Sequence, residues 1–455
     1  MNHKDQYREE CERIRASETW KHAAASRMEQ PPRRPRAAKW VFTGALAAAL
    51  VCALVFSPLL KPATVTVEAK ENLMENIRAQ KQQLPAAPSQ DFISAQADFA
   101  VKLFQKTTDA GKNSLVSPTS AALALGMTAN GAKGSTLSQF EALLGGGMDL
   151  SALNKSFAAE QSALKAVTSG KTLLANSIWY RDQGLSVKKP FLQSNADFFG
   201  ADAYRLDFGD PAAVGKINSW VDKNTGGTIK KMVGRIEPEE MMILINALYL
   251  EQEWRSPYIN SRDGTFHAPE GDKTVKMMES TETYLHDGEA EGILKPLKDP
   301  RYAFAAILPK SGTSVNDYVQ SLTGRKFLSL LRSGGDGTAI GTLPKFKFSC
   351  ALSLNDALQS LGLTDAFNSG KADFSAMGSS PAGNLYIGNV LQKTFLQVDE
   401  AGLKAGAATA VILDAGSSSS QRPRSVVFDR PFVIAVVDTS TNLPLFLGVV
   451  ADPAA

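Results

Sequence analysis

The stretch VDEAGLKAGAATAVILDAGSSSSQRPR, residues 398–424, decides how the rest of this chain is interpreted. Read with a period of two, one face from Leu403 to Leu413 is apolar apart from Thr409. Such alternation predicts a strand with one face on a core. The stretch is also poor in bulky side chains and continues into four serines, Ser417–Ser420, a composition that favours exposed chain. These residues therefore suit a loop in one state and a strand in another, although their alanine content also allows a helix followed by a linker.

The flanking sequence carries further motifs in a fixed order. They are Asn113–Ser120 (NSLVSPTS), Leu174–Trp179 (LANSIW), Ile217–Val221 (INSWV), Asn246–Tyr249 (NALY) with Trp254, Leu343–Phe346 (LPKF), Ala372–Ser375 (ADFS), Phe428–Phe432 (FDRPF) and Phe446–Gly448 (FLG). Together with the opening stretch, this ordered series resembles the serpin family, which comprises serine-protease inhibitors and their non-inhibitory relatives. The resemblance covers about Asp91 to Pro453.

The resemblance implies an α+β fold: a multi-helix domain with a large mixed central β-sheet and an exposed reactive-centre loop. The residues agree, because strand-like and helical stretches alternate without a regular βαβ order. Strands are expected at Met242–Leu250, Tyr302–Leu308, Val426–Phe428 and Phe432–Val437, and helices at Asp91–Gln105, Ser117–Asn130 and Ile217–Asn224.

The family match assigns roles to two groups of residues. The hinge of the loop would comprise Glu400, Gly402, Leu403, Ala405, Gly406, Ala407, Ala408 and Thr409. The shutter and breach, which control opening of the central sheet, would comprise Ser117, Ser120, Asn246, Trp254 and Gln392. Leu403 stands where the family usually has Thr or Ser, and Gln392 stands where many relatives have His. Ala401 and Lys404 also depart from usually acidic positions, but none of these departures puts a charge on the inward face.

The bond that a protease would cut is not located by the sequence. Counting forward from the hinge places it near Gly416–Ser417, whereas counting back from Pro431 places it near Ser420–Gln421. Cleavage after Ala415 or Gly416 would suit an elastase- or subtilisin-like enzyme. Arg424–Ser425 would suit a trypsin-like enzyme, but it lies late for insertion of the loop.

The function implied by the resemblance is inhibition of serine or cysteine endopeptidases by a suicide-substrate mechanism, and not enzymatic catalysis. The protease cleaves the loop, and the freed arm inserts into the central sheet before the acyl-enzyme is hydrolysed. The sequence contains no HExxH, GxSxG or phosphate-loop motif, and only His267 and His286 lie in the domain. No cofactor or metal is expected. A non-inhibitory binding module and a cleavage sensor remain alternatives.

The N-terminal part adds an expected membrane anchor. Residues 1–39 form a basic tail, Trp40–Leu60 is free of charge, and a span of about 20 apolar residues crosses a bilayer. The arginines before this run predict a cytoplasmic N-terminus and an extracellular domain. A signal peptide cleaved near Val67–Ala69, giving a secreted protein, is the alternative.

A tether, residues 61–90, with a helix over 68–84, would lead to the domain at residues 91–455. Lys and Arg number 49 against 46 Asp and Glu, so no nucleic-acid partner is expected. The three cysteines lie far apart and predict no disulfide framework. A monomer is expected.

Overall fold

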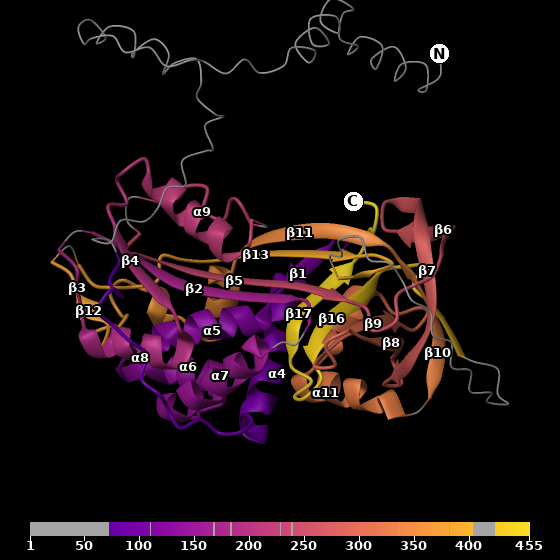
Figure 1. The fold of residues 1–455 in the computed structure, drawn as a ribbon, viewed down its shortest axis with the longest axis horizontal. Helices are drawn as coiled ribbons and strands as arrows, with labels where there is room; N and C mark the ends of the chain where they lie inside the picture. Colours follow the sequence, from indigo (N-terminus) through magenta and orange to yellow (C-terminus); the bar gives the residue numbers. More distant parts are fainter. Residues whose placement is uncertain are drawn as a thin grey trace, which may run out of the picture. The chain divides into compact units, whose positions relative to one another are not determined.

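The computed structural model describes residues 72–109, 111–166, 169–182, 184–227, 229–237, 240–335, 337–381, 383–403 and 424–455 (Figure 1). The expected tail and anchor, residues 1–60, lie outside this part of the chain, as do residues 404–423. Within the described ranges, no helix combines the length and the apolar composition that crossing a bilayer requires.

A six-stranded mixed sheet runs through the domain (Figure 1). Its order is β11 (Phe346–Ser353), β13 (Asn389–Val398), β14 (Gly402–Leu403), β5 (Met242–Glu253), β2 (Lys171–Arg181) and β4 (Asp202–Leu206). The pairs β13–β5 and β2–β4 are parallel, and the others are antiparallel. The two long strands β2 and β5 form the longest pairing of this sheet.

A nine-stranded sheet forms the second layer. Its strands are β1 (Ser114–Val116), β17 (Pro444–Val450), β16 (Phe432–Asp438), β9 (Tyr302–Pro309), β8 (Ala290–Pro296), β7 (Gly271–His286), β10 (Thr338–Pro344) and β15 (Arg424–Val427), with β6 (Ser261–Ala268) on β7. β9, β16 and β17 are buried along their whole length, because their continuous apolar runs suit a strand covered on both faces. Two short strands, β3 (Ser186–Val187) and β12 (Gly378–Ser379), pair separately.

The described part of the chain contains nine α-helices and two short 3-10 helices. The α-helices are α4 (Gln90–Thr107), α5 (Pro118–Ala129), α6 (Gly134–Gly145), α7 (Leu150–Lys165), α8 (Lys189–Phe199), α9 (Ala213–Asn224), α10 (Val315–Ser321), α11 (Gly324–Arg332) and α12 (Asn355–Ser360), and the 3-10 helices are Ser333–Gly335 and Asp365–Phe367. α5 to α8 lie on one face of the six-stranded sheet and α9 on the other (Figure 1). α5 is buried on every side, as expected for a helix that is apolar all round, and it begins with Ser117 as N-cap and Pro118 in its first turn.

The predicted α+β class, with a large mixed sheet, is confirmed. The expected strands appear as β5, β9, β15 and β16, and the expected helices as α4, α5 and α9. The helix expected over 68–84 is wrong for its described part, because residues 72–84 form a bridge and turns but no helix. This segment packs on the domain instead: Asn72 pairs with Tyr204 of β4, and Asp197 of α8 accepts a hydrogen bond from the amide of Gln80.

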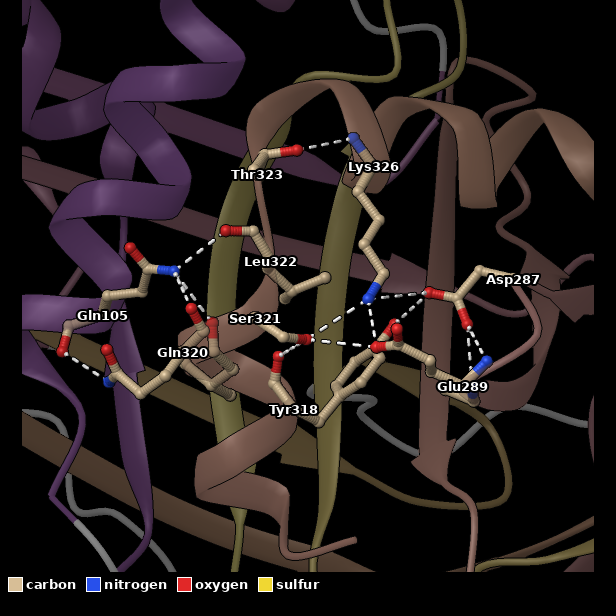
Figure 2. A network of polar contacts seen from close by, with 11 residues as sticks. Gln105, Asp287, Glu289, Tyr318, Gln320, Ser321, Leu322, Thr323 and Lys326 are labelled. Atoms are coloured by element: carbon tan, nitrogen blue, oxygen red, sulfur yellow. Dashed lines mark hydrogen bonds and ion pairs between the residues drawn. The ribbon is translucent and has the colours of Figure 1, made fainter.

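A polar network joins α10 and α11 to the turn between β7 and β8 (Figure 2). Lys326 of α11 lies 2.5 Å from a Glu289 carboxylate oxygen and 3.8 Å from Asp287, and its Nζ donates to the Ser321 hydroxyl. Its ammonium also lies 5.1 Å from the centre of the Tyr318 ring. These contacts hold the two helices against the nine-stranded sheet.

Candidate functional site

The hinge begins with a tight turn at the end of β13. Oδ1 of Asp399 accepts hydrogen bonds from the amides of Ala401 and Gly402, at 2.9 and 3.2 Å. An aspartate that bonds the backbone two residues ahead is a common way to stabilise a turn. The chain therefore reverses after Val398 and returns as β14, antiparallel to β13, with Val398 opposite Leu403.

β14 occupies a strand position between β13 and β5. Gly402 lies opposite Glu253, and Leu403 lies opposite Gln252. A side chain at Gly402 would overlap the carbonyl oxygen of Gln252, so the close approach of the two backbones requires glycine there. Leu403 is fully buried in the apolar cluster under this end of the sheet.

Below β14, the two flanking strands meet directly. Asn389–Gln392 of β13 pair in parallel with Ile243–Asn246 of β5. The sheet is thus open to a further strand at one end, where β14 lies, and closed at the other. The predicted hinge residues Ala405, Gly406, Ala407, Ala408 and Thr409 lie outside the described residues.

Three N–H groups from the segment after β5 hold the hinge backbone. The Trp254 indole Nε1 donates to the carbonyl of Asp399 at 2.8 Å, and the Trp254 amide donates to the carbonyl of Ala401 at 2.9 Å. The Tyr258 amide donates to the carbonyl of Glu400 at 2.9 Å. Trp254 is 1% exposed, so its ring is anchored by packing while its N–H reaches the hinge.

The side chain of Glu400 is bound by two partners. Lys345 Nζ lies 2.6 Å from Oε2, and the Ser261 hydroxyl donates to Oε1 at 2.8 Å. Partial burial acts to raise the pKa of the Glu400 carboxyl, but the hydrogen bonds and the charge of Lys345 outweigh it and hold the pKa below its usual range. The carboxylate is therefore ionised at neutral pH and ties the hinge to the end of β10.

Gln392 lies in the middle of β13 and bonds Ser117 at the start of α5. The Gln392 side-chain oxygen accepts from the Ser117 amide, and its Nε2 donates to the Ser117 carbonyl, both at 2.8 Å. Ser117 also caps α5 by accepting from the amide of Ser120, at 3.3 Å. One buried amide side chain thus fastens β13 to the helix beneath the sheet.

Asn246 is brought opposite Gln392 by the β13–β5 register, although its side chain is outside the described residues. The start of α5, with Ser117 and Ser120, therefore lies beneath the point where Gln392 of β13 pairs with Asn246 of β5. Trp254 lies with Glu400, Gly402 and Leu403 at the end where β14 enters.

The candidate cleavage residues fall into two groups. Ala415, Gly416, Ser417 and Ser420 lie outside the described residues. Arg424 and Ser425 lie in β15, where they pair in parallel with Ala339 and Ile340 of β10. The guanidinium of Arg424 stacks 4.7 Å from the centre of the Tyr284 ring.

Sequence reasoning missed several residues that contact the hinge and the shutter. Lys345 and Ser261 bind Glu400, and Tyr258 bonds its carbonyl. In β13, the Thr394 hydroxyl donates to the carbonyl of Leu115 beside the Gln392 contact. The position of Lys345 within the LPKF motif could have marked it as a functional residue. Its partner Glu400, however, lies 55 positions away in the sequence, so the sequence does not show that the two meet.

Comparisons with known proteins agree with this geometry. The family model described as Serpin (serine protease inhibitor) matches residues 94–453. A serpin-like protein of Thermococcus kodakarensis is 30% identical over 370 residues, which cover 79% of this chain and 85% of that protein. Serpin B6 of Macaca fascicularis is 31% identical over 380 residues, which cover 79% of this chain and 98% of that protein.

Solved structures give the same answer. The crystal structure of tengpin, a thermophilic serpin, in its native state is similar with a TM-score of 0.79 and 41% identity, over 84% of this chain and 99% of that one. The structure of tengpin in its latent state has a TM-score of 0.71 and 38% identity, over 81% of this chain and 99% of that one. The sequence motifs, the fold and these matches lead to one conclusion: the chain belongs to the serpin family.

Proposed function

We propose that this serpin inhibits serine endopeptidases, or cysteine endopeptidases as the alternative target class, by cleavage of its loop and insertion of the freed arm. The observation that carries the proposal is the position of β14. Its two residues occupy the first places of a strand between β13 and β5, and Leu403 is fully buried there. An arm that continues in this register extends the strand that β14 begins.

The inward pattern of the arm supports insertion. Because side chains alternate along a strand, residues that follow Leu403 in steps of two would face the same core. These residues are Ala405, Ala407, Thr409, Val411 and Leu413. Burial of this face would contribute on the order of 5 to 10 kcal/mol from apolar area.

Insertion requires β13 and β5 to separate where they now pair. Four residue pairs, from Asn389–Ile243 to Gln392–Asn246, would have to part. The inserted arm would bond to both strands, so the ladder hydrogen bonds lost between β13 and β5 are replaced. The fold would therefore be held in a state from which cleavage releases free energy.

We propose that the target enzymes cut after small residues, in the manner of elastase or subtilisin. The peptide bond between Arg424 and Ser425 lies in β15, which pairs with β10. A protease binds an extended chain that is free of such pairing, so this peptide bond is a poor match for a cleavage site. Ala415 and Gly416 lie farther from β15 and closer to the hinge. Cleavage there would leave an arm whose length fits the sheet.

We also propose that Trp40–Leu60 anchors the chain in the cell membrane, with the N-terminus in the cytoplasm and the serpin domain outside as a monomer. The support is the uncharged run and the arginines that precede it. Secretion after cleavage of a signal is the competing outcome. Protease protection of the domain in intact and permeabilised cells separates the two, together with the mass of the mature chain.

The test of inhibition uses the full chain purified in detergent. It is incubated with subtilisin-, elastase- and trypsin-like proteases, and the products are resolved on denaturing gels and by mass spectrometry. A covalent band at the summed mass is expected, and it identifies the cleaved bond. Cleavage without this band, and without a rise in thermal stability, would mean that the arm does not insert and would favour a non-inhibitory binding role.

A further inference from the structure

A lysine ammonium is buried beneath the segment that holds the hinge. Lys295 of β8 is 1% exposed, and its Nζ lies 2.5 Å from Glu282 of β7, which is 8% exposed. The Nζ also donates to the Ser280 hydroxyl at 3.3 Å and to the carbonyl of Ser256 at 2.9 Å. Burial lowers the pKa of Lys295, whereas the Glu282 carboxylate acts to raise it.

Two aromatic rings complete the surroundings of this ammonium. Lys295 Nζ lies 4.2 Å from the centre of the Tyr258 ring and 5.3 Å from that of Trp254. The two rings meet edge to face, with centres 5.9 Å apart. A cation over an aromatic face is attracted by the ring, more strongly when both are removed from water.

Residues 254–258 therefore have the hinge on one side and Lys295 on the other. Their Trp254 and Tyr258 N–H groups hold the carbonyls of Asp399, Glu400 and Ala401. On the other side, Lys295 contacts every second residue of the same segment: the Trp254 ring, the Ser256 carbonyl and the Tyr258 ring. The lysine thus fixes the segment whose donors grip the hinge, although it does not touch the hinge through any contact described.

We propose that Lys295 is a positioning residue that holds residues 254–258 against the hinge and thereby slows detachment of the hinge from the breach. The proposal rests on the proposed loop insertion for its functional meaning, but not for its structural test. Stability alone does not call for this residue, because a buried ion pair is often no more stabilising than apolar side chains of similar volume. A directed contact to the Ser256 carbonyl is something that an apolar side chain could not supply.

The test is hydrogen–deuterium exchange on the uncleaved full chain in detergent, without protease. The main variant is the double substitution Lys295→Met with Glu282→Met, which removes both charges and leaves neither one buried alone. Exchange in peptides covering 252–260 and 398–403 is expected to become roughly tenfold faster, as the loss of one hydrogen-bond anchor implies. The single variant Lys295→Met should show the same change with a lower unfolding midpoint, because Glu282 is then left unpaired.

A matched control comes from the network in Figure 2. Lys326 likewise contacts a tyrosine ring, two carboxylates and a serine hydroxyl, but these contacts join α11 to the other end of β8. Lys326→Met should leave exchange in the two hinge peptides unchanged. If exchange in the hinge peptides became equally faster in Lys326→Met, the effect would reflect a general destabilisation of the domain. That result would overturn the proposal.

Unchanged exchange in the folded double variant would also overturn the proposal. The functional consequence is read separately, as the number of inhibitor molecules consumed for each protease molecule trapped, which should rise if β14, the start of the inserted strand, is released from its place. If the chain inhibits no protease, that ratio cannot be measured, but the exchange result still decides whether Lys295 positions the segment.

Discussion

Replacing Leu403 with arginine tests the insertion mechanism most directly. Leu403 is fully buried between Val398 and Gln252, so the substitution removes a buried apolar side chain and demands that a charge take its place. The first change costs about 1.5 to 3 kcal/mol, and the desolvation of an unpaired charge adds several more. Because Leu403 is already buried before cleavage, the arginine is expected to release β14 from the sheet. Re-entry of the charge during insertion would then cost about 5 kcal/mol in total and slow that step by roughly a thousandfold or more.

The assay counts molecules of inhibitor consumed for each protease molecule trapped. Since insertion competes with hydrolysis of the acyl-enzyme, Leu403→Arg is expected to be cleaved as a substrate, with little covalent complex on denaturing gels. Val427→Arg is the control, because Val427 lies near the other end of the loop in β15 and is 40% exposed. Undiminished trapping by Leu403→Arg would refute the reasoning that this side chain must stay buried during insertion.

Three further predictions concern stability and pH. Gln392→Leu removes both bonds to Ser117 and leaves the buried Ser117 N–H without a partner, whereas the Ser117 carbonyl keeps its bond from the Ala121 amide. We expect unfolding in urea to show a loss of about 1 to 3 kcal/mol, and an unchanged midpoint would contradict the proposed fastening of β13. The folded pKa of Glu400 is lowered, so its stabilising contribution is present above the unfolded pKa and is lost as the pH falls through the folded pKa. Protection from exchange at 398–403, taken relative to the intrinsic exchange rate at each pH, should therefore fall in acid, and in Glu400→Gln this protection should not change with pH in that range. Burial, with a smaller contribution from the charge of Asp438, raises the pKa of Glu160 to about 8. Its contribution to stability is full below the unfolded value of about 4.5 and declines as the pH rises through 8, so Glu160→Gln should flatten the fall in unfolding free energy between pH 5 and pH 8.

The sequence alone was sufficient for the family, the fold class and most of the long elements. The motifs are short and local, and the ordered series carries the resemblance. The strands β5, β9 and β16 and the helices α4, α5 and α9 are marked by apolar runs, apolar periodicity or capping residues, which act within a few residues of one another.

Only the tertiary structure decided which distant groups meet. Gln392 bonds Ser117 across 275 positions, and β14 finds its place only because β5 and β13 leave one end of the sheet open. The helix predicted from local propensity is also wrong over residues 72–84. In this segment Leu73, Met74 and Ile77 pack on the core and no helix forms. The pattern of residues indicates which secondary structure a segment favours. Sheet register and packing determine which residues far apart in the chain come into contact. The identity of the buried partner of Lys295 therefore belongs to the fold and could not be read from any single stretch of sequence.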